Sequence, residues 1–190
     1  DVYKRQMLCL VILIVIQTLA AMKMSVLNKL LEQRAYTDAH TGLPNKDACE
    51  VLLNNKETVA KHTACIMFDL NNLKIINDTK GHSKGDQLIL NFARLLRNVI
   101  PQKDFVGRYG GDEFMVVIYN TSKTEIEDIL KQLSREKDRL NSSGNNMPID
   151  YACGWAISDA DSECTIQMLL DKADYYMYEN KQAYKKSKKS

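Results

Sequence analysis

The N-terminal part of the chain is a continuous run of hydrophobic positions that ends at a lysine. Residues 7–22 are almost wholly apolar, and Lys23 follows them. A helix over this run would span about 24 Å, which is shorter than the roughly 30 Å hydrocarbon core of a bilayer. We therefore expect residues 7–22 to be the remnant of a transmembrane helix, with Lys23 and Lys29 on the cytoplasmic side. A cleaved signal peptide and a buried helix are the alternatives that this pattern leaves open.

The segments on either side of this run have different patterns. Residues 1–6 precede the first methionine and look like translated sequencing-adapter DNA, so we expect a non-native leader there. Residues 23–36 are expected to be a helical linker, because apolar side chains recur in it at three- to four-residue spacing. These side chains are Val26, Leu27, Leu30 and Leu31. The stripe either pairs with a second copy of the chain or packs on its own domain, and it is too short to establish a coiled coil.

The rest of the chain alternates between strand-like and helix-like patterns. Short apolar, β-branched or aromatic runs predict strands at residues 64–68, 104–106, 114–119 and 149–157. Amphipathic spacing predicts helices at residues 87–99, 122–140 and 165–183. This order predicts an α+β sandwich, in which helices cover an antiparallel sheet.

Two glycines followed by two carboxylates lie between two of these predicted strands. Gly110 and Gly111 predict the tight turn of a β-hairpin, since glycine tolerates positive φ and lets a ligand approach the backbone. Asp112 and Glu113 then lie at the tip, near enough to one another to hold a hard divalent cation. An ordinary polar hairpin is the alternative interpretation of the same residues.

Further polar residues follow a buried strand upstream of the hairpin. Asp69 comes directly after the apolar run at residues 64–68, where a carboxylate either binds a metal or caps the next segment. The local pattern alone makes Asn77 the end of one helix and Asp86 the cap of the next.

Taken together, these residues resemble one family. Residues 68–74 read FDLNNLK, residues 77–78 ND, residues 81–82 GH, residues 85–86 GD and residues 108–114 RYGGDEF. The combination closely resembles the GGDEF family of diguanylate cyclases over about residues 34–187, and we assign the domain to residues 37–187. The resemblance implies a palm-like, ferredoxin-related nucleotide-cyclase fold with a largely antiparallel sheet of about five strands.

The resemblance also implies an activity. Two GTP molecules would be condensed into cyclic di-GMP with release of two pyrophosphates, by two domains that face each other in a homodimer. The catalytic residues would be Asp69, Asp112 and Glu113. The ligands of Mg²⁺, or of Mn²⁺ in its place, would be Asp69, the carbonyl of Leu70, Asp112 and Glu113.

The GTP molecule would lie along two further sets of residues. Asn77 and Asp86 would bind the edge of guanine. The residues expected along the rest of the nucleotide are Asn72, Leu73, Lys74, Gly111, Lys181 and Lys185. Lys181 and Lys185 are four residues apart and therefore share one helical face, for which a solvated basic surface is the alternative interpretation.

The chain departs from the family pattern near this site. Asn71 stands where the family usually has a second Asp, which removes a carboxylate. Lys185 stands in place of Arg, which removes a bidentate fork, and Tyr184 stands in place of Gly. His40 replaces a Leu of the family's N-terminal motif, and we expect it at the surface.

Another departure concerns product binding. Many family members carry Arg-x-x-Asp upstream of the hairpin, where the Arg binds the phosphates of cyclic di-GMP. This chain has Asp104 but Pro101 in the place of the Arg. Feedback inhibition through this site is therefore expected to be absent.

Composition and charge narrow the remaining possibilities. A formal net charge of +2 gives no indication of a nucleic-acid partner. The five cysteines lack the spacing of a metal site and fit a reducing compartment. We expect a protein of the bacterial cytoplasmic membrane with its catalytic domain in the cytoplasm. The alternative function is a catalytically silent GGDEF domain that binds GTP as a sensor or serves as a protein-interaction module.

Overall fold

The chain forms two compact units. A computed structural model describes residues 1–55, 58–60, 62–144, 147–158 and 164–187. The first unit is Asp1–Tyr36 and the second is Thr37–Ser190. Each unit is described below by itself.

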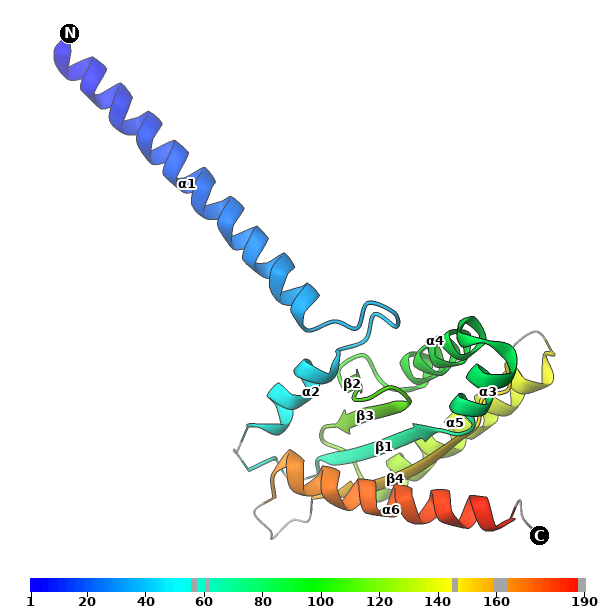
Figure 1. Cartoon of the computed structure of the whole chain (residues 1–190). Helices are drawn as coiled ribbons and strands as arrows, with labels where there is room; N and C mark the ends of the chain where they lie inside the picture. Colours follow the sequence, from blue (N-terminus) through cyan, green and yellow to red (C-terminus); the bar gives the residue numbers. More distant parts are fainter. Residues whose placement is uncertain (56–57, 61, 145–146, 159–163, 188–190) are drawn as a thin grey trace. The chain divides into compact units, whose positions relative to one another are not determined.

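The N-terminal unit is one long helix, α1 (Val2–Ala35), drawn in blue in Figure 1. Its stretch Val2–Glu32 is long and apolar enough to cross a membrane. The 31 residues of this stretch rise about 46 Å, which exceeds the roughly 30 Å hydrocarbon core. The helix therefore runs on without a break through the segments that were expected to be a leader, a membrane remnant and a linker.

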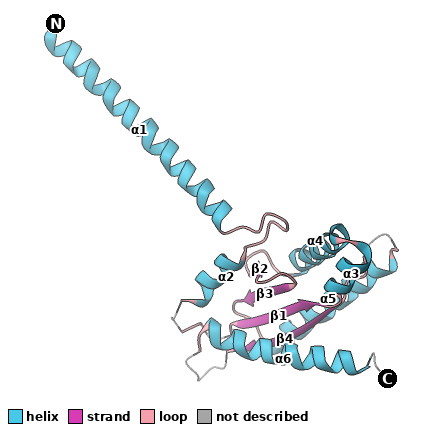
Figure 2. Ribbon diagram, viewed as in Figure 1, coloured by secondary structure: helices cyan, strands magenta, loops and turns pink. Residues whose placement is uncertain are grey.

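The second unit is built on a four-stranded antiparallel sheet (Figure 2). Its strands are β1 (Ala64–Leu70), β2 (Phe105–Arg108), β3 (Glu113–Ile118) and β4 (Tyr151–Ile157). The strand order is β2-β3-β1-β4, and every neighbouring pair is antiparallel. The predicted α+β class is therefore confirmed.

The sheet has one strand fewer than the expected five among the described residues. The segment before the first short helix makes an isolated bridge between Thr37 and Pro44 and no ladder. Proline has no backbone N–H to donate, so a ladder cannot continue through Pro44.

Helices cover both faces of the sheet. The helices are α2 (Lys46–Leu53), α3 (Leu73–Lys80), α4 (His82–Val99), α5 (Lys123–Ser142) and α6 (Ile166–Ser187). One hydrophobic cluster joins α4 and α5 to one face, and a second joins α2 and α6 to the other. All seven residues of β1 are buried, because this central strand is covered on both faces.

Helix α6 packs closely on β4 because of one glycine. A Cβ atom on Gly154 would overlap the Met177 nitrogen and the Ala173 carbonyl oxygen of α6. Both obstacles are backbone atoms of a helix, which cannot rotate away. The absence of a side chain at Gly154 therefore sets how near α6 lies to the sheet.

We predict that Gly154→Ala lowers the free energy of unfolding of the second unit by about 3 kcal/mol, the upper end of the usual cost of overpacking. Urea unfolding of the full chain in mild detergent, followed by the fluorescence of the single tryptophan, Trp155 in β4, would measure this change. Gly111→Ala is the matched control, because no atom lies within 4 Å of a Cβ there. Equal losses in the two variants would contradict the packing argument.

Candidate active site

The Gly-Gly-Asp-Glu segment forms the expected hairpin between β2 and β3. The N–H groups of Tyr109 and Gly110 donate to the Glu113 carbonyl at 2.9 and 3.2 Å. The Asp112 carbonyl accepts from the N–H of Leu70 at 2.9 Å. The first two hydrogen bonds close the hairpin, and the third attaches its tip to the end of the central strand β1.

The hairpin glycines are needed for a different reason from the one expected. Neither Gly110 nor Gly111 has a positive φ, so the turn does not use the left-handed region. A Cβ on Gly110 would lie 2.5 Å from Oε2 of Glu113. Gly110 therefore makes room for the carboxylate of Glu113, while Gly111 faces open space.

Two of the predicted carboxylates lie side by side in the sheet. In the antiparallel register of β1 and β3, Asp69 is directly opposite Glu113. Side chains in this relation have their Cβ atoms about 5 Å apart. The Asp69 side chain is 8% exposed, and its Oδ2 accepts from Nζ of Lys181 at 2.6 Å. Its other oxygen, Oδ1, is buried and has no hydrogen-bond partner among the described residues.

Negative charge accumulates around this pair. Burial raises the pKa of Glu113, and the neighbouring carboxylates of Asp112, Asp69 and Asp174 raise it further. Lys181 opposes this increase in part. A cation at this place would favour the ionised form of Glu113.

The donor set fits a hard divalent cation. Mg²⁺ is usually held by one or two carboxylates together with substrate phosphates and water, and the unpartnered Oδ1 of Asp69 is a free oxygen ligand. Among the described residues, no three His, Cys, Asp or Glu side chains converge into a complete metal cage. These residues therefore fit a cation that is also bound by the phosphates of a second molecule. The Leu70 carbonyl stays a predicted ligand of this cation.

A cleft of about 480 Å³ lies beside the carboxylate pair. Asp69 and Glu113 line it from the sheet, and Lys181 and Lys185 line it from α6. Its size lies within the usual range of small-ligand pockets. The structure thus brings together two of the predicted acidic residues, Asp69 and Glu113, and the two lysines predicted on the last helix.

The predicted base-binding residues lie outside the lining of this cleft, on α3 and α4. Asn77 lies in α3, and its Oδ1 is buried without a hydrogen-bond partner among the described residues. A Cβ on Gly85 would overlap this amide oxygen. Gly85 therefore makes space for the amide of Asn77. The sequence pattern led us to assign no role to Gly85. A glycine within a helix is unfavourable, so its presence near the start of this helix was a signal that the position has a role.

The local interpretation of Asp86 as a helix cap is wrong. Helix α4 begins at His82, so Asp86 is its fifth residue and is exposed. Gly81, with φ +84°, closes α3 and precedes α4 without any side-chain cap. Its N–H donates to the Asn77 carbonyl at 3.0 Å, so Asn77 does take part in ending α3.

The loop after β1 has a strained residue at its centre. Asn72 precedes α3 with φ +63°, a left-handed conformation that Asn tolerates better than most residues. The first residues of α3 are Leu73, which is half-buried, and Lys74, which is exposed. Asn71 is buried, and its Nδ2 has no hydrogen-bond partner among the described residues. These residues also lie outside the lining of the cleft.

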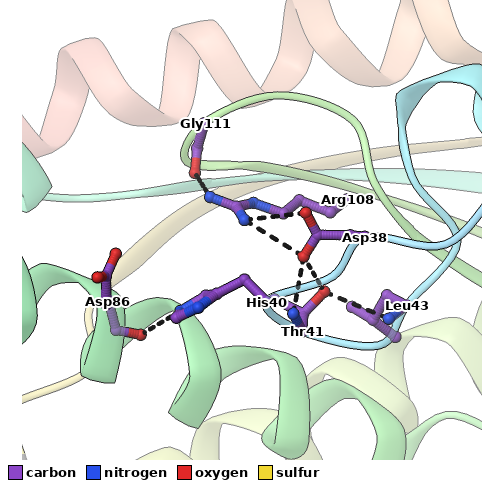
Figure 3. A network of polar contacts seen from close by, with 7 residues as sticks. All are labelled: Asp38, His40, Thr41, Leu43, Asp86, Arg108 and Gly111. Carbon is purple, nitrogen blue, oxygen red and sulfur yellow. Dashed lines mark hydrogen bonds and ion pairs between the residues drawn. The ribbon is translucent and has the colours of Figure 1, made fainter.

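A polar network that the sequence did not indicate holds the hairpin from the other side (Figure 3). Nη1 of Arg108 lies 3.2 Å from Oδ2 of Asp38, and Nη2 donates to the Gly111 carbonyl at 2.8 Å. The backbone N–H and the hydroxyl of Thr41 also donate to Asp38. Burial raises the pKa of Asp38, but the hydrogen bonds from Thr41 and the charge of Arg108 outweigh it, and the net pKa lies below 3.8.

His40 extends the same network to α4. Its Nε2 lies 3.1 Å from the backbone carbonyl oxygen of Asp86 (Figure 3). The expected surface position of His40 agrees with its exposure. The residue that replaces the family's Leu thus contacts the backbone of a predicted base-binding residue.

Asp104, the remaining half of the Arg-x-x-Asp pattern, is buried. Its Oδ1 accepts from the N–H of Tyr119 at 3.1 Å, and the Pro101 carbonyl accepts from the N–H of Asp104 at 3.0 Å. Asp104 therefore stabilises the backbone around it through these hydrogen bonds. The Arg that would complete the Arg-x-x-Asp pattern is replaced by Pro101.

The fold and the site together define a class of protein: an antiparallel α+β domain with a carboxylate pair beside a helix that lines the cleft with two lysines. Residues 35–187 match the family described as "Diguanylate cyclase, GGDEF domain". The chain therefore belongs to the GGDEF family.

The chain is similar to curated proteins over most of its own length. The signaling protein YkoW of Bacillus subtilis is 31% identical over 164 residues, which are 83% of this chain and 20% of YkoW. The diguanylate cyclase DgcP of Escherichia coli K12 is 30% identical over 165 residues, 84% of this chain and 48% of DgcP. The chain therefore spans less than half the length of these two relatives.

A solved structure supports the fold. The coiled coil and GGDEF domain of DgcB from Caulobacter crescentus, in complex with c-di-GMP, superposes with a TM-score of 0.75 at 23% identity. The match covers 88% of this chain and 91% of that one.

We predict that Asp38→Asn lowers the free energy of unfolding by about 1–2 kcal/mol at pH 7, since hydrogen bonds to a charged partner contribute about that much. Because the pKa of Asp38 is lowered on folding, its contribution is present above pH 3.8 and is lost as the pH falls through the folded-state pKa. The difference between the wild type and the variant should therefore vanish in acid, as followed by urea unfolding.

Asp128→Asn is the control for this variant. Asp128 pairs with Lys131 on the surface, with both side chains more than 60% exposed. Its loss should change stability by less than about 0.5 kcal/mol. If Asp128→Asn lowered the free energy of unfolding as much as Asp38→Asn does, the network around Asp38 would contribute no more than an ordinary surface ion pair.

Proposed function

We propose that this protein is a diguanylate cyclase, which condenses two GTP molecules into cyclic di-GMP with release of two pyrophosphates. The observation that carries the proposal is the Asp69–Glu113 pair, with its buried unpartnered oxygen, beside a cleft lined by Lys181 and Lys185. Acidic and basic groups that converge in this way suit a metal-bound triphosphate.

Each part of the site has a role in phosphoryl transfer to a hydroxyl. Asp69, the Leu70 carbonyl and Glu113 would hold Mg²⁺ or Mn²⁺, which supplies neutralisation of phosphate charge when bound. Asp112 accepts the proton of the ribose 3′-hydroxyl or joins the metal ligands. The 3′-oxygen then bonds to the α-phosphorus of the other GTP, and the bond from that phosphorus to pyrophosphate breaks.

The phosphates and the base are held by separate groups. Lys181 and Lys185 neutralise the terminal phosphates from α6, and Lys74 does so from the start of α3. The backbone of Asn72 and Leu73 at that helix start, and that of Gly111 at the hairpin, lie along the rest of the nucleotide. Asn77 and Asp86 bind the guanine edge.

The reaction needs two copies of the domain, because one domain binds one GTP and each hydroxyl attacks the other nucleotide. We therefore propose a homodimer with two antiparallel sites. Helix α1 would anchor the protein in the bacterial cytoplasmic membrane and leave the GGDEF domain in the cytoplasm.

The full chain in mild detergent, given GTP and Mg²⁺ at concentrations that allow dimerisation, is expected to release cyclic di-GMP and pyrophosphate in a ratio of one to two. Chromatography of the nucleotides would measure both. Asp112→Asn should reduce turnover by about 100-fold or more, in line with the loss of a general base. Asp128→Asn is the matched control and should leave turnover unchanged. GTP binding without any product in the wild type would instead identify a silent binding domain.

Asn77→Ala is expected to weaken GTP binding by about 10-fold and ATP binding much less, because it removes hydrogen bonds of about 1–1.5 kcal/mol to the guanine edge. Titration of the full chain with each nucleotide would measure the ratio of the two affinities. Asn98→Ala, an exposed amide on α4, is the control. An unchanged ratio would exclude Asn77 from base recognition.

A further inference from the structure

Lys181 lies where a metal ion would compete with it. Its Nζ is 2.6 Å from Oδ2 of Asp69, in an ion pair whose carboxylate is 8% exposed and whose lysine side chain is 26% exposed. The proposed function assigns the same lysine to the phosphates of GTP and the same aspartate to the metal. In the structure, these two protein groups bind each other.

The surrounding charge explains why this pair forms. Asp69 and Glu113 are opposite one another in the sheet, and like charges in that relation destabilise a strand pair. Asp112 and Asp174 add to the negative field at Glu113, and Lys181 reduces it. An ammonium group therefore supplies some of the positive charge that a divalent cation would supply in the complete site.

The geometry also leaves a route for exchange. A lysine is a point charge on a flexible four-carbon chain, unlike the planar fork of an arginine. Lys181 bonds Oδ2 alone, so Oδ1 of Asp69 is buried without a partner among the described residues. The same side chain borders the cleft that Lys185 also lines, one helical turn away. A swing from Asp69 into this cleft needs rotation of the Lys181 side chain and no backbone movement.

We propose that Lys181 is a positioning residue with two successive partners. In the free protein it holds the Asp69 side chain in place, as a stand-in for the metal. When a metal-bound triphosphate enters, Lys181 leaves Asp69 for the phosphates, and the metal takes its place. Metal alone must displace an ammonium group that gains no new partner, so metal and nucleotide bind cooperatively. This inference rests on the proposed function, which assigns a metal to Asp69 and the phosphates of GTP to Lys181.

The test is a titration with Mn²⁺ alone, without nucleotide. Free Mn²⁺ is measured by electron paramagnetic resonance with the full chain in mild detergent. Lys181→Met should tighten Mn²⁺ binding by about 5- to 150-fold, the usual range of coupling between two sites. The same variant should weaken the binding of GTP with Mn²⁺. Removing the positive charge of Lys181 should therefore strengthen the binding of Mn²⁺ alone and weaken the binding of GTP with Mn²⁺.

Two further variants separate exchange from general electrostatics. Lys185→Met removes an equal charge from the same cleft without a contact to Asp69, and should change Mn²⁺ affinity by less than about 3-fold, as expected of a screened charge. Lys181→Arg should weaken Mn²⁺ binding, since a fork can engage both oxygens of Asp69. Adding Asp69→Asn to Lys181→Met should abolish the gain. Trp155 fluorescence would establish that each variant is folded.

Unchanged or weaker Mn²⁺ binding in Lys181→Met, with Trp155 fluorescence as in the wild type, would overturn the proposal. So would an equal gain in Lys185→Met. Because the titration contains no GTP, its result is independent of turnover. Cyclic di-GMP formation by the wild type with no gain in Lys181→Met would refute the exchange and leave the proposed function intact. A gain in a chain that makes no product would support the exchange in a silent domain.

Discussion

The antiparallel register of β1 and β3 is the constraint on which the rest of the site depends. It sets Asp69 opposite Glu113, so two carboxylates that would repel each other are fixed on neighbouring strands. Lys181 compensates part of this negative charge by forming an ion pair with Asp69. The register is itself fixed by packing, because a slip by one residue would exchange the β1 side chains that enter the two hydrophobic clusters on opposite faces of the sheet. Folding thus provides the energy that keeps the acidic groups together.

Backbone contacts on two sides hold the hairpin that carries this register. On one side, the Asp112 carbonyl is bonded to the end of β1. On the other, Arg108 joins the Gly111 carbonyl to Asp38 in the loop that follows the N-terminal unit. His40, in the same loop, contacts the backbone of Asp86 on α4. This loop therefore contacts both the hairpin, through Arg108, and helix α4, through the backbone of Asp86.

The departures from the family pattern have distinct structural consequences. Asn71 places a buried amide without a described partner where the family has a carboxylate, so the local negative charge is lower by one. Lys185 remains on the wall of the cleft, where it keeps the charge of the family's Arg but offers no bidentate fork. Both changes leave the Asp69–Glu113 pair and its register intact.

The sequence by itself determined the α+β class, the hairpin at Gly110 and Gly111, and the buried strand that carries Asp69 near its end. These features follow from hydrophobic period and turn chemistry, which are local properties. The predicted start of α4 was wrong. This helix follows a glycine of positive φ, Gly81, and has no side-chain cap, which is the feature by which a local sequence pattern reveals the start of a helix. Only the tertiary structure decided that Glu113 faces Asp69, that Lys181 pairs with Asp69, and that Arg108 binds Asp38. Each of these contacts joins elements far apart in the chain, and its geometry is set by packing of the whole domain rather than by neighbouring residues.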